Sequence, residues 1–140
     1  MQFIDLKFQY QTIQTQINNA IFGVLQHGQY ILGPEVYELE GKLASYADTK
    51  FCVSCSSGTD ALLMSLMAAE IGPGDAVFTS PFTFIATAEV IKLVGATPIF
   101  VDIQEDTFNI DPILLKQSVQ DCLSMGKLQP KAVIPVDLFG

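Results

Sequence analysis

From residue 51 onward, short apolar segments alternate with segments of helix-forming residues. The apolar segments are residues 51–55, 76–80, 97–103 and 131–138, and the helical segments between them are residues 58–70, 83–94 and 111–124. Strands that are apolar on both faces and alternate with helices are typical of a parallel α/β sheet. Ligands bind such sheets at the carboxyl ends of the strands, so the pattern predicts a ligand site near residues 56–59 and 81–84.

The first 50 residues predict two helices. Apolar residues recur at helical spacing between residues 10 and 26, and Gly28 ends this helix. Pro34 suits the first position of a second helix. The predicted fold class is therefore α/β, a mostly parallel sheet flanked by helices and preceded by two helices. Because no helix follows residues 131–138 to cover that strand, we expect residues 1–140 to be the front part of a larger domain.

Composition narrows the classes of function. Nearly half of the 140 residues are hydrophobic (49%), which indicates a globular chain, and no apolar run approaches the roughly 20 residues of a membrane span. A net charge of −8 with only seven basic residues argues against nucleic-acid binding. The first residues lack a basic n-region and an apolar h-region, so we expect no signal peptide and a cytoplasmic protein.

The three cysteines, Cys52, Cys55 and Cys122, suit a reducing compartment. Cys52-x-x-Cys55 has the spacing of a thioredoxin-like redox pair, but Cys52 falls within a predicted strand and Val53-Ser54 lacks turn residues. A zinc site needs four ligands, and His27 is the only other candidate of this type. We expect neither a redox pair nor a metal site.

The junction Ser56-Ser57-Gly58-Thr59-Asp60 leads from an apolar segment into a predicted helix. A helix start presents free backbone N–H groups and the positive end of the helix dipole, which suit an anion such as a phosphate. The same residues also fit an ordinary helix start, with Ser57 or Thr59 as N-cap and Asp60 in the first turn. The junction alone leaves both interpretations open.

Several blocks of sequence carry a family resemblance, in order and at family spacing. They are Phe3-Ile4-Asp5-Leu6, Gly28-Gln29-Tyr30-Ile31-Leu32-Gly33-Pro34-Glu35-Val36, Ser57-Gly58-Thr59-Asp60-Ala61-Leu62, Gly72-Pro73-Gly74-Asp75, Thr83-Phe84-Ile85-Ala86-Thr87-Ala88, Gly95-Ala96-Thr97-Pro98, Val101-Asp102-Ile103 and Ile134-Pro135-Val136-Asp137-Leu138-Phe139-Gly140. The chain resembles the N-terminal part of DegT/StrS-type nucleotide-sugar aminotransferases, which are pyridoxal-phosphate enzymes with the type I aminotransferase fold. The resemblance implies that residues 1–140 are a partial cofactor-binding (large) domain, without the rest of that domain and without the C-terminal small domain.

The resemblance also implies roles for particular residues. The pyridoxal 5'-phosphate group would contact Gly58, Thr59 and Asp60, and Phe84 would stack on the pyridine ring, although Phe84 could instead be a core residue. Gln29 and Tyr30 lie in a segment that approaches the sugar-nucleotide entrance in relatives. We expect His27 to be a helix-end residue favoured by the dipole rather than a catalytic base.

The implied activity is transfer of an amino group, with glutamate as the expected donor, to a keto-sugar nucleotide. The substrate expected is a UDP-linked 3-keto sugar for surface-polysaccharide biosynthesis, and the expected assembly is a homodimer. In relatives, the lysine that binds the cofactor covalently and the carboxylate on its pyridine nitrogen lie beyond the position of Gly140. None of the seven lysines here lies in the lysine motif, so no catalytic residue is assigned and the 140-residue chain alone is expected to be inactive.

Two alternatives remain from the sequence. One is a sugar 3-dehydratase of the same fold, in which histidine replaces the cofactor-binding lysine. The other is a non-catalytic α/β module that uses the Gly58-Thr59 phosphate site for binding or dimerisation. Cofactor absorbance and the sequence downstream of Gly140 would separate them.

Overall fold

The computed structural model describes residues 3–140, which divide into two compact units with the boundary between Ser54 and Cys55. Met1 and Gln2, which belong to the segment predicted to hold no secretion signal, lie outside the described residues. Within residues 3–140, no helix has both the length and the apolar character needed to cross a membrane.

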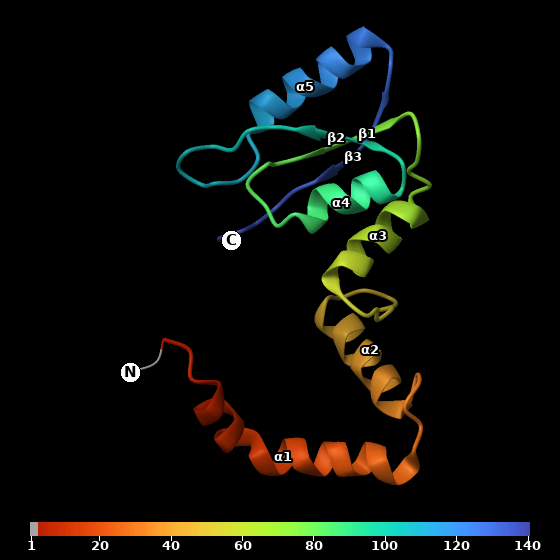
Figure 1. The fold of residues 1–140 in the computed structure, drawn as a ribbon, viewed down its shortest axis with the longest axis vertical. Helices are drawn as coiled ribbons and strands as arrows, with labels where there is room; N and C mark the ends of the chain where they lie inside the picture. Colours follow the sequence, from red (N-terminus) through yellow and green to blue (C-terminus); the bar gives the residue numbers. More distant parts are fainter. Residues whose placement is uncertain (1–2) are drawn as a thin grey trace. The chain divides into compact units, whose positions relative to one another are not determined.

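The first unit contains the two predicted helices, α1 (Leu6–His27) and α2 (Pro34–Tyr46) (Figure 1). The Asp5 side chain caps α1 by accepting a hydrogen bond from the Phe8 N–H at 2.9 Å. Gly28 ends α1 in the left-handed conformation (φ 69°), and its N–H donates to the Val24 carbonyl. Pro34 begins α2, as predicted, and Glu35 lies in the first turn.

The turn between α1 and α2 has a constrained backbone. Leu32 has a φ of 47°, a region that residues other than glycine rarely adopt. A Cβ atom added to Gly33 would lie 2.3 Å from the carbonyl oxygen of Gln29. Glycine at position 33 therefore allows the two ends of the turn to approach each other.

After α2, the chain runs without regular structure to the unit boundary. The Glu40 carboxylate accepts hydrogen bonds from the backbone N–H and the hydroxyl of Ser54, at 2.7 and 2.8 Å. These hydrogen bonds hold the pKa of the Glu40 carboxyl below its ordinary value, and the bond from the Ser54 backbone has the largest effect. This contact ties residue 54 to α2.

The second unit is a three-layer α/β structure. Its elements are α3 (Gly58–Ala68), β1 (Asp75–Thr79), α4 (Ala86–Leu93), β2 (Thr97–Phe100), α5 (Pro112–Met125) and β3 (Gln129–Ile134). The strands form one parallel sheet in the order β2-β1-β3, and Phe78 of β1 pairs with Ile99 and Val133 in its neighbours. The parallel sheet confirms the fold class predicted from the alternating pattern.

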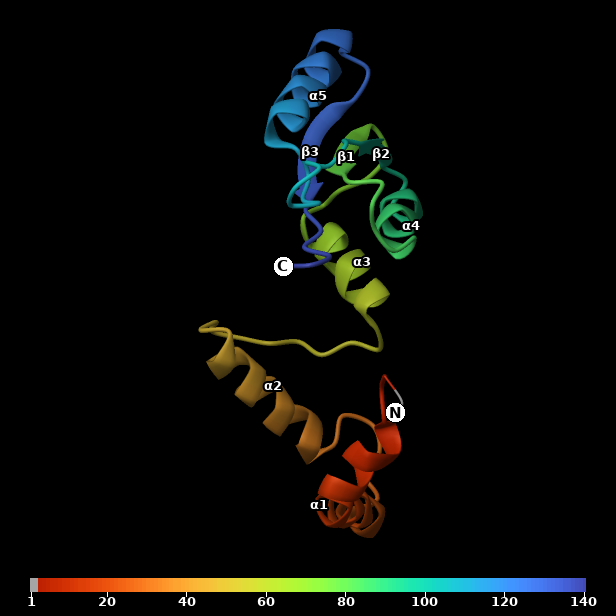
Figure 2. The same ribbon diagram turned by 90° about the vertical axis from the view of Figure 1, so that its left-hand side faces the viewer.

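Helices cover both faces of this sheet (Figures 1 and 2). On the face toward α3 and α4, Val77 packs with Leu66 and Val90 in one apolar cluster. On the opposite face, Phe78 packs with Cys122 of α5 in a second cluster. Successive residues of β1 thus point to opposite faces, and both faces are buried.

The strand predicted at residues 51–55 is wrong. No strand within residues 3–140 pairs with this segment, and Phe51 and Val53 are 75% and 72% exposed. An apolar segment becomes a strand only where another strand supplies the ladder of hydrogen bonds. Here the Ser54 N–H donates instead to the Glu40 side chain.

Three predicted boundaries also differ for local reasons. The helix expected from residue 83 begins at Ala86, because the Ser80 hydroxyl accepts the Phe82 N–H and closes a turn first. The strand expected to reach residue 103 ends at Phe100, and Ile103 forms an isolated antiparallel bridge with Ile110. β3 ends at Ile134 rather than 138, directly before Pro135, which has no N–H to donate.

We predict that Gly33→Ala destabilises the protein by about 1–3 kcal/mol, because the added methyl group overlaps the Gln29 carbonyl oxygen. Gly41→Ala is the matched control: it lies inside α2 with no atom within 4 Å of the added Cβ. It should stabilise the protein by up to about 1 kcal/mol through helix propensity. Thermal unfolding of both variants measures the difference, and equal midpoints would contradict the steric argument.

Candidate functional site

The parts of the second unit that the sequence predicts to form a ligand site lie at the carboxyl edge of the sheet. β1 and β3 end at this edge, and the N-terminal ends of α3 and α4 face the same side (Figures 1 and 2). The segment from Ser80 to Ile85 connects β1 to α4 here. This is the edge at which parallel α/β sheets bind ligands.

Ser57 is the N-cap of α3, which decides between the two cap residues considered from the sequence. Its backbone is extended (φ −159°, ψ 165°), and its side-chain oxygen accepts the Asp60 N–H at 3.1 Å. The hydroxyls of Ser56 and Ser57 both donate to the Asp60 carboxylate. These hydrogen bonds hold the pKa of the Asp60 carboxyl below its ordinary value, and the bond from Ser56 has the largest effect. Asp60 is therefore negatively charged at neutral pH.

Two backbone donors at the start of α3 remain without a partner. Within the described residues, the N–H groups of Gly58 and Thr59 and the Thr59 hydroxyl make no hydrogen bond. A Cβ atom added to Gly58 would meet nothing within 4 Å, so the space beside it is open. Two free amides, a hydroxyl and the positive end of the helix dipole therefore meet at an open surface.

This arrangement fits a phosphate group at Gly58 and Thr59. The fit at Asp60 is poorer, because its N–H is already bonded to Ser57 and its carboxylate would repel an anion. The two interpretations of the junction are therefore compatible: Ser57 caps the helix through one N–H and leaves two others available.

Phe84 lies in the segment that follows β1 and is 73% exposed. It belongs to neither apolar cluster of the core, in contrast to the possibility that it is a core residue. The neighbouring Phe82 instead packs against Phe108 and Phe139, with ring centroids 5.8 and 6.1 Å away. An exposed aromatic ring at this edge offers a flat apolar surface to a ligand.

Gln29 and Tyr30 belong to the first unit, in the turn between α1 and α2. Both are exposed, and together with Gly28 and Ile31 they line a hollow of about 380 Å³. Sequence reasoning did not find the pair that His27 and Glu35 form beside this turn, at 2.9 Å. The sequence alone does not indicate this pair, because the two residues lie on different helices and only the geometry of the turn brings them together.

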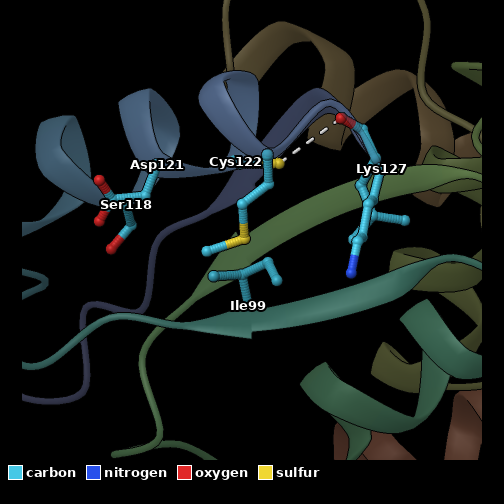
Figure 3. A pocket seen from close by; sticks show the side chains of 7 residues that line it. Ile99, Ser118, Asp121, Cys122 and Lys127 are labelled. Atoms are coloured by element: carbon cyan, nitrogen blue, oxygen red, sulfur yellow. Dashed lines mark hydrogen bonds between the residues drawn. The ribbon is translucent and has the colours of Figure 1, made fainter.

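A further hollow, of about 280 Å³, lies between α5 and β2 (Figure 3). Ile99, Cys122 and Met125 make its walls, and the Cys122 thiol lies 3.7 Å from the Leu128 carbonyl oxygen. Lys127 and Leu128 come directly before β3, so this hollow lies toward the amino ends of the strands rather than the carboxyl edge. No pattern in the sequence indicates this hollow.

Known proteins resemble this chain closely. Residues 11–140 match the DegT/DnrJ/EryC1/StrS aminotransferase family. The UDP-2-acetamido-2-deoxy-3-oxo-D-glucuronate aminotransferase of Pseudomonas aeruginosa is 49% identical over 140 residues, which are 100% of this chain and 37% of that protein. The chain thus spans little more than a third of this relative.

Solved structures agree with the sequence match. A DegT DnrJ EryC1 StrS aminotransferase from Brucella abortus superposes with a TM-score of 0.96 and 51% identity, over 100% of this chain and 38% of its own. DesV of S. venezuelae, solved in complex with a ketimine intermediate, superposes with a TM-score of 0.86 and 35% identity, over 99% of this chain and 36% of its own. These matches confirm the predicted fold, that of the type I aminotransferases.

We predict that Ser57→Ala destabilises the protein by about 1 kcal/mol, because the Asp60 N–H loses its capping acceptor. Ser65→Ala, in the same helix, is the control: the Ser65 hydroxyl only donates to the Ala61 carbonyl, so its loss should be neutral or slightly stabilising. Urea unfolding of both variants checks this. Equal loss of unfolding free energy in the Ser65 and Ser57 variants would show that the cap at Ser57 adds no specific stability.

Proposed function

Because the chain belongs to the DegT/DnrJ/EryC1/StrS aminotransferase family, we propose that it is the N-terminal part of a pyridoxal-phosphate-dependent sugar aminotransferase. In this proposal residues 1–140 supply part of the cofactor-binding (large) domain. The rest of that domain and a C-terminal small domain correspond to the remainder of the relatives' length, of which the chain spans 37% and 38%. Aminotransferases of this family depend on pyridoxal phosphate.

The observation that carries the proposal is the set of unpartnered donors at the start of α3. The amides of Gly58 and Thr59 and the Thr59 hydroxyl would hold the cofactor's phosphate. Phe84 would lie against the pyridine ring and exclude water from that face. When bound, pyridoxal phosphate supplies the electron sink that amino-group transfer needs.

The substrate we propose is a UDP-linked 3-keto sugar, with glutamate as amino donor. The name of the Pseudomonas aeruginosa relative, which is 49% identical, supports this class of substrate. A spore coat polysaccharide biosynthesis protein of Bacillus subtilis, 43% identical over 116 residues, supports a role in polysaccharide biosynthesis. Gln29 and Tyr30 are the residues proposed to contact the sugar nucleotide. The cytoplasm is the proposed compartment, because Cys52, Cys55 and Cys122 are all free thiols.

The activity is tested on the complete enzyme with pyridoxal phosphate, glutamate and UDP-2-acetamido-2-deoxy-3-oxo-D-glucuronate. Release of 2-oxoglutarate that depends on the keto sugar supports the proposal. A protein that takes up the cofactor but lacks the absorbance of a covalent lysine–cofactor linkage would point to the dehydratase alternative. A protein that does not take up the cofactor would point to the non-catalytic module. The 140-residue chain alone should show no glutamate-dependent turnover above the free-cofactor background.

Thr59→Val should weaken pyridoxal-phosphate binding to the complete enzyme by about 1–3 kcal/mol, because a charge-assisted hydrogen bond to the phosphate is lost. Thr59→Ser keeps the hydroxyl and is the matched control, expected to bind nearly as tightly as the native protein. Titration of the cofactor-free enzyme, followed by cofactor absorbance, measures both. Unchanged affinity in the valine variant would falsify the phosphate assignment.

We also propose that the complete enzyme is a homodimer. α1 buries no residue, although it carries several large apolar side chains that are exposed in the chain by itself: Leu6, Phe8, Tyr10, Ile13, Ile21, Phe22 and Leu25. An exposed apolar surface of this kind marks a protein interface. A second copy of the same chain is the proposed partner, since closed dimers are the commonest oligomers of soluble proteins.

Ile21→Asp should weaken this dimer, because a charge would be buried at the interface. Gln16→Asp introduces the same charge on a different face of α1 and should leave the dimer intact. Light scattering coupled to size exclusion gives the masses. A native enzyme that is active and loaded with cofactor as a monomer would rule out the dimer.

A further inference from the structure

Both ring nitrogens of His27 are engaged beside the turn that connects α1 and α2. Nε2 lies 2.9 Å from the Glu35 carboxylate, in the first turn of α2. Nδ1 accepts a hydrogen bond from the backbone N–H of Gln29 at 3.0 Å. The side chains of His27 and Glu35 are partly covered, with 27% and 48% of their surface exposed.

These two contacts determine the tautomer of His27. An Nδ1 that accepts the Gln29 N–H carries no proton, so in the neutral ring the proton lies on Nε2 and is donated to Glu35. The acceptor is a carboxylate, since the His27 contact lowers the pKa of Glu35. No ring nitrogen is left to accept a proton from a substrate, which argues against His27 as a general base.

This pair acts on a backbone that is already constrained. Gly28 and Leu32 have φ values of 69° and 47°, and Gly33 approaches the Gln29 carbonyl too closely for any side chain. Strained backbone persists only where the surrounding contacts determine it, and it concentrates at binding sites. Within residues 28–33, the side chains at 29–32 are all exposed, so the turn presents its side chains outward.

We propose that His27 is a positioning residue. Glu35 fixes the Nε2–H tautomer, and the Nδ1 atom then fixes the Gln29 amide and with it the turn that presents Gln29 and Tyr30 to the sugar nucleotide. This inference rests on the proposed function for its substrate, but the tautomer and the backbone contact do not depend on it. The pairing links two helices through one ring, as a carboxylate–histidine pair does when it orients a metal ligand.

Two substitutions separate the two ring nitrogens in the complete enzyme. In His27→Asn, the amide oxygen takes the place of Nδ1 and can still accept the Gln29 N–H, while the contact with Glu35 is lost. In His27→Gln, the amide nitrogen takes the place of Nε2 and can still donate to Glu35, while the acceptor for Gln29 is lost. Thermal unfolding of both variants shows whether each is folded before kinetics are compared.

The kinetic readout is the KM for UDP-2-acetamido-2-deoxy-3-oxo-D-glucuronate. His27→Gln should raise this KM about 3- to 10-fold with kcat unchanged, because the turn loses one hydrogen bond that positions it. His27→Asn should leave this KM at its native value, because the acceptor for the Gln29 N–H is kept. The reaction with glutamate alone is the control, since it does not involve the keto sugar. An unchanged KM in the glutamine variant, or an equal rise in both variants, would overturn the positioning role.

A second readout needs no substrate. In the nitrogen-15 spectrum of the histidine-labelled enzyme, the signals missing from His27→Asn belong to His27. Shifts of an Nε2-protonated neutral ring support the inference, and an Nδ1-protonated ring would overturn it. If the native enzyme shows the expected tautomer but no amination of the keto sugar, the proposed function fails and the substrate part of the inference fails with it, while the His27–Gln29 contact stands.

Discussion

The burial of β1 on both faces is the constraint on which the second unit depends. Val77 and Phe78 are adjacent and nearly fully buried, 0% and 1% exposed, so each face of the strand needs its own cover. α3 and α4 supply one cover and α5 the other. Because β2 and β3 run parallel to β1, all three strands end at one edge, and the connections that follow them collect there.

At that edge, the start of α3 combines a structural role with the proposed binding role in consecutive residues. Ser57 satisfies one N–H of the first turn, and the Asp60 carboxylate is held by the two serine hydroxyls. Gly58 and Thr59 keep their amides free. A fully capped helix would have no donor left for an anion, and an uncapped one would be less stable. In the sequence Ser-Ser-Gly-Thr-Asp, one N–H of the helix start is therefore used for capping, and two others remain free for an anion.

Much of this could be predicted because it depends on local patterns. Gly28, Pro34 and the alternation of apolar and helical segments mark elements whose causes lie within a few residues. The strand at residues 51–55 failed because its pattern is local but its pairing is not: a ladder partner is a property of the tertiary structure. The His27–Glu35 pair was missed for the same reason, since the turn geometry alone brings these residues together.

The charge of the chain limits how either proposed ligand can be held. A phosphate and a sugar nucleotide are both anions, whereas the chain carries a net charge of −8 and its basic residues, apart from one histidine, are seven lysines. Long-range electrostatics of these 140 residues therefore oppose binding. Within these 140 residues, the donors proposed for recognition are neutral and act at short range: the free amides of Gly58 and Thr59, and the side chains of Gln29 and Tyr30 in the turn that His27 orders. Such donors act only in a fixed geometry, and for this reason we propose that the cap at Ser57 and the tautomer of His27 matter to binding.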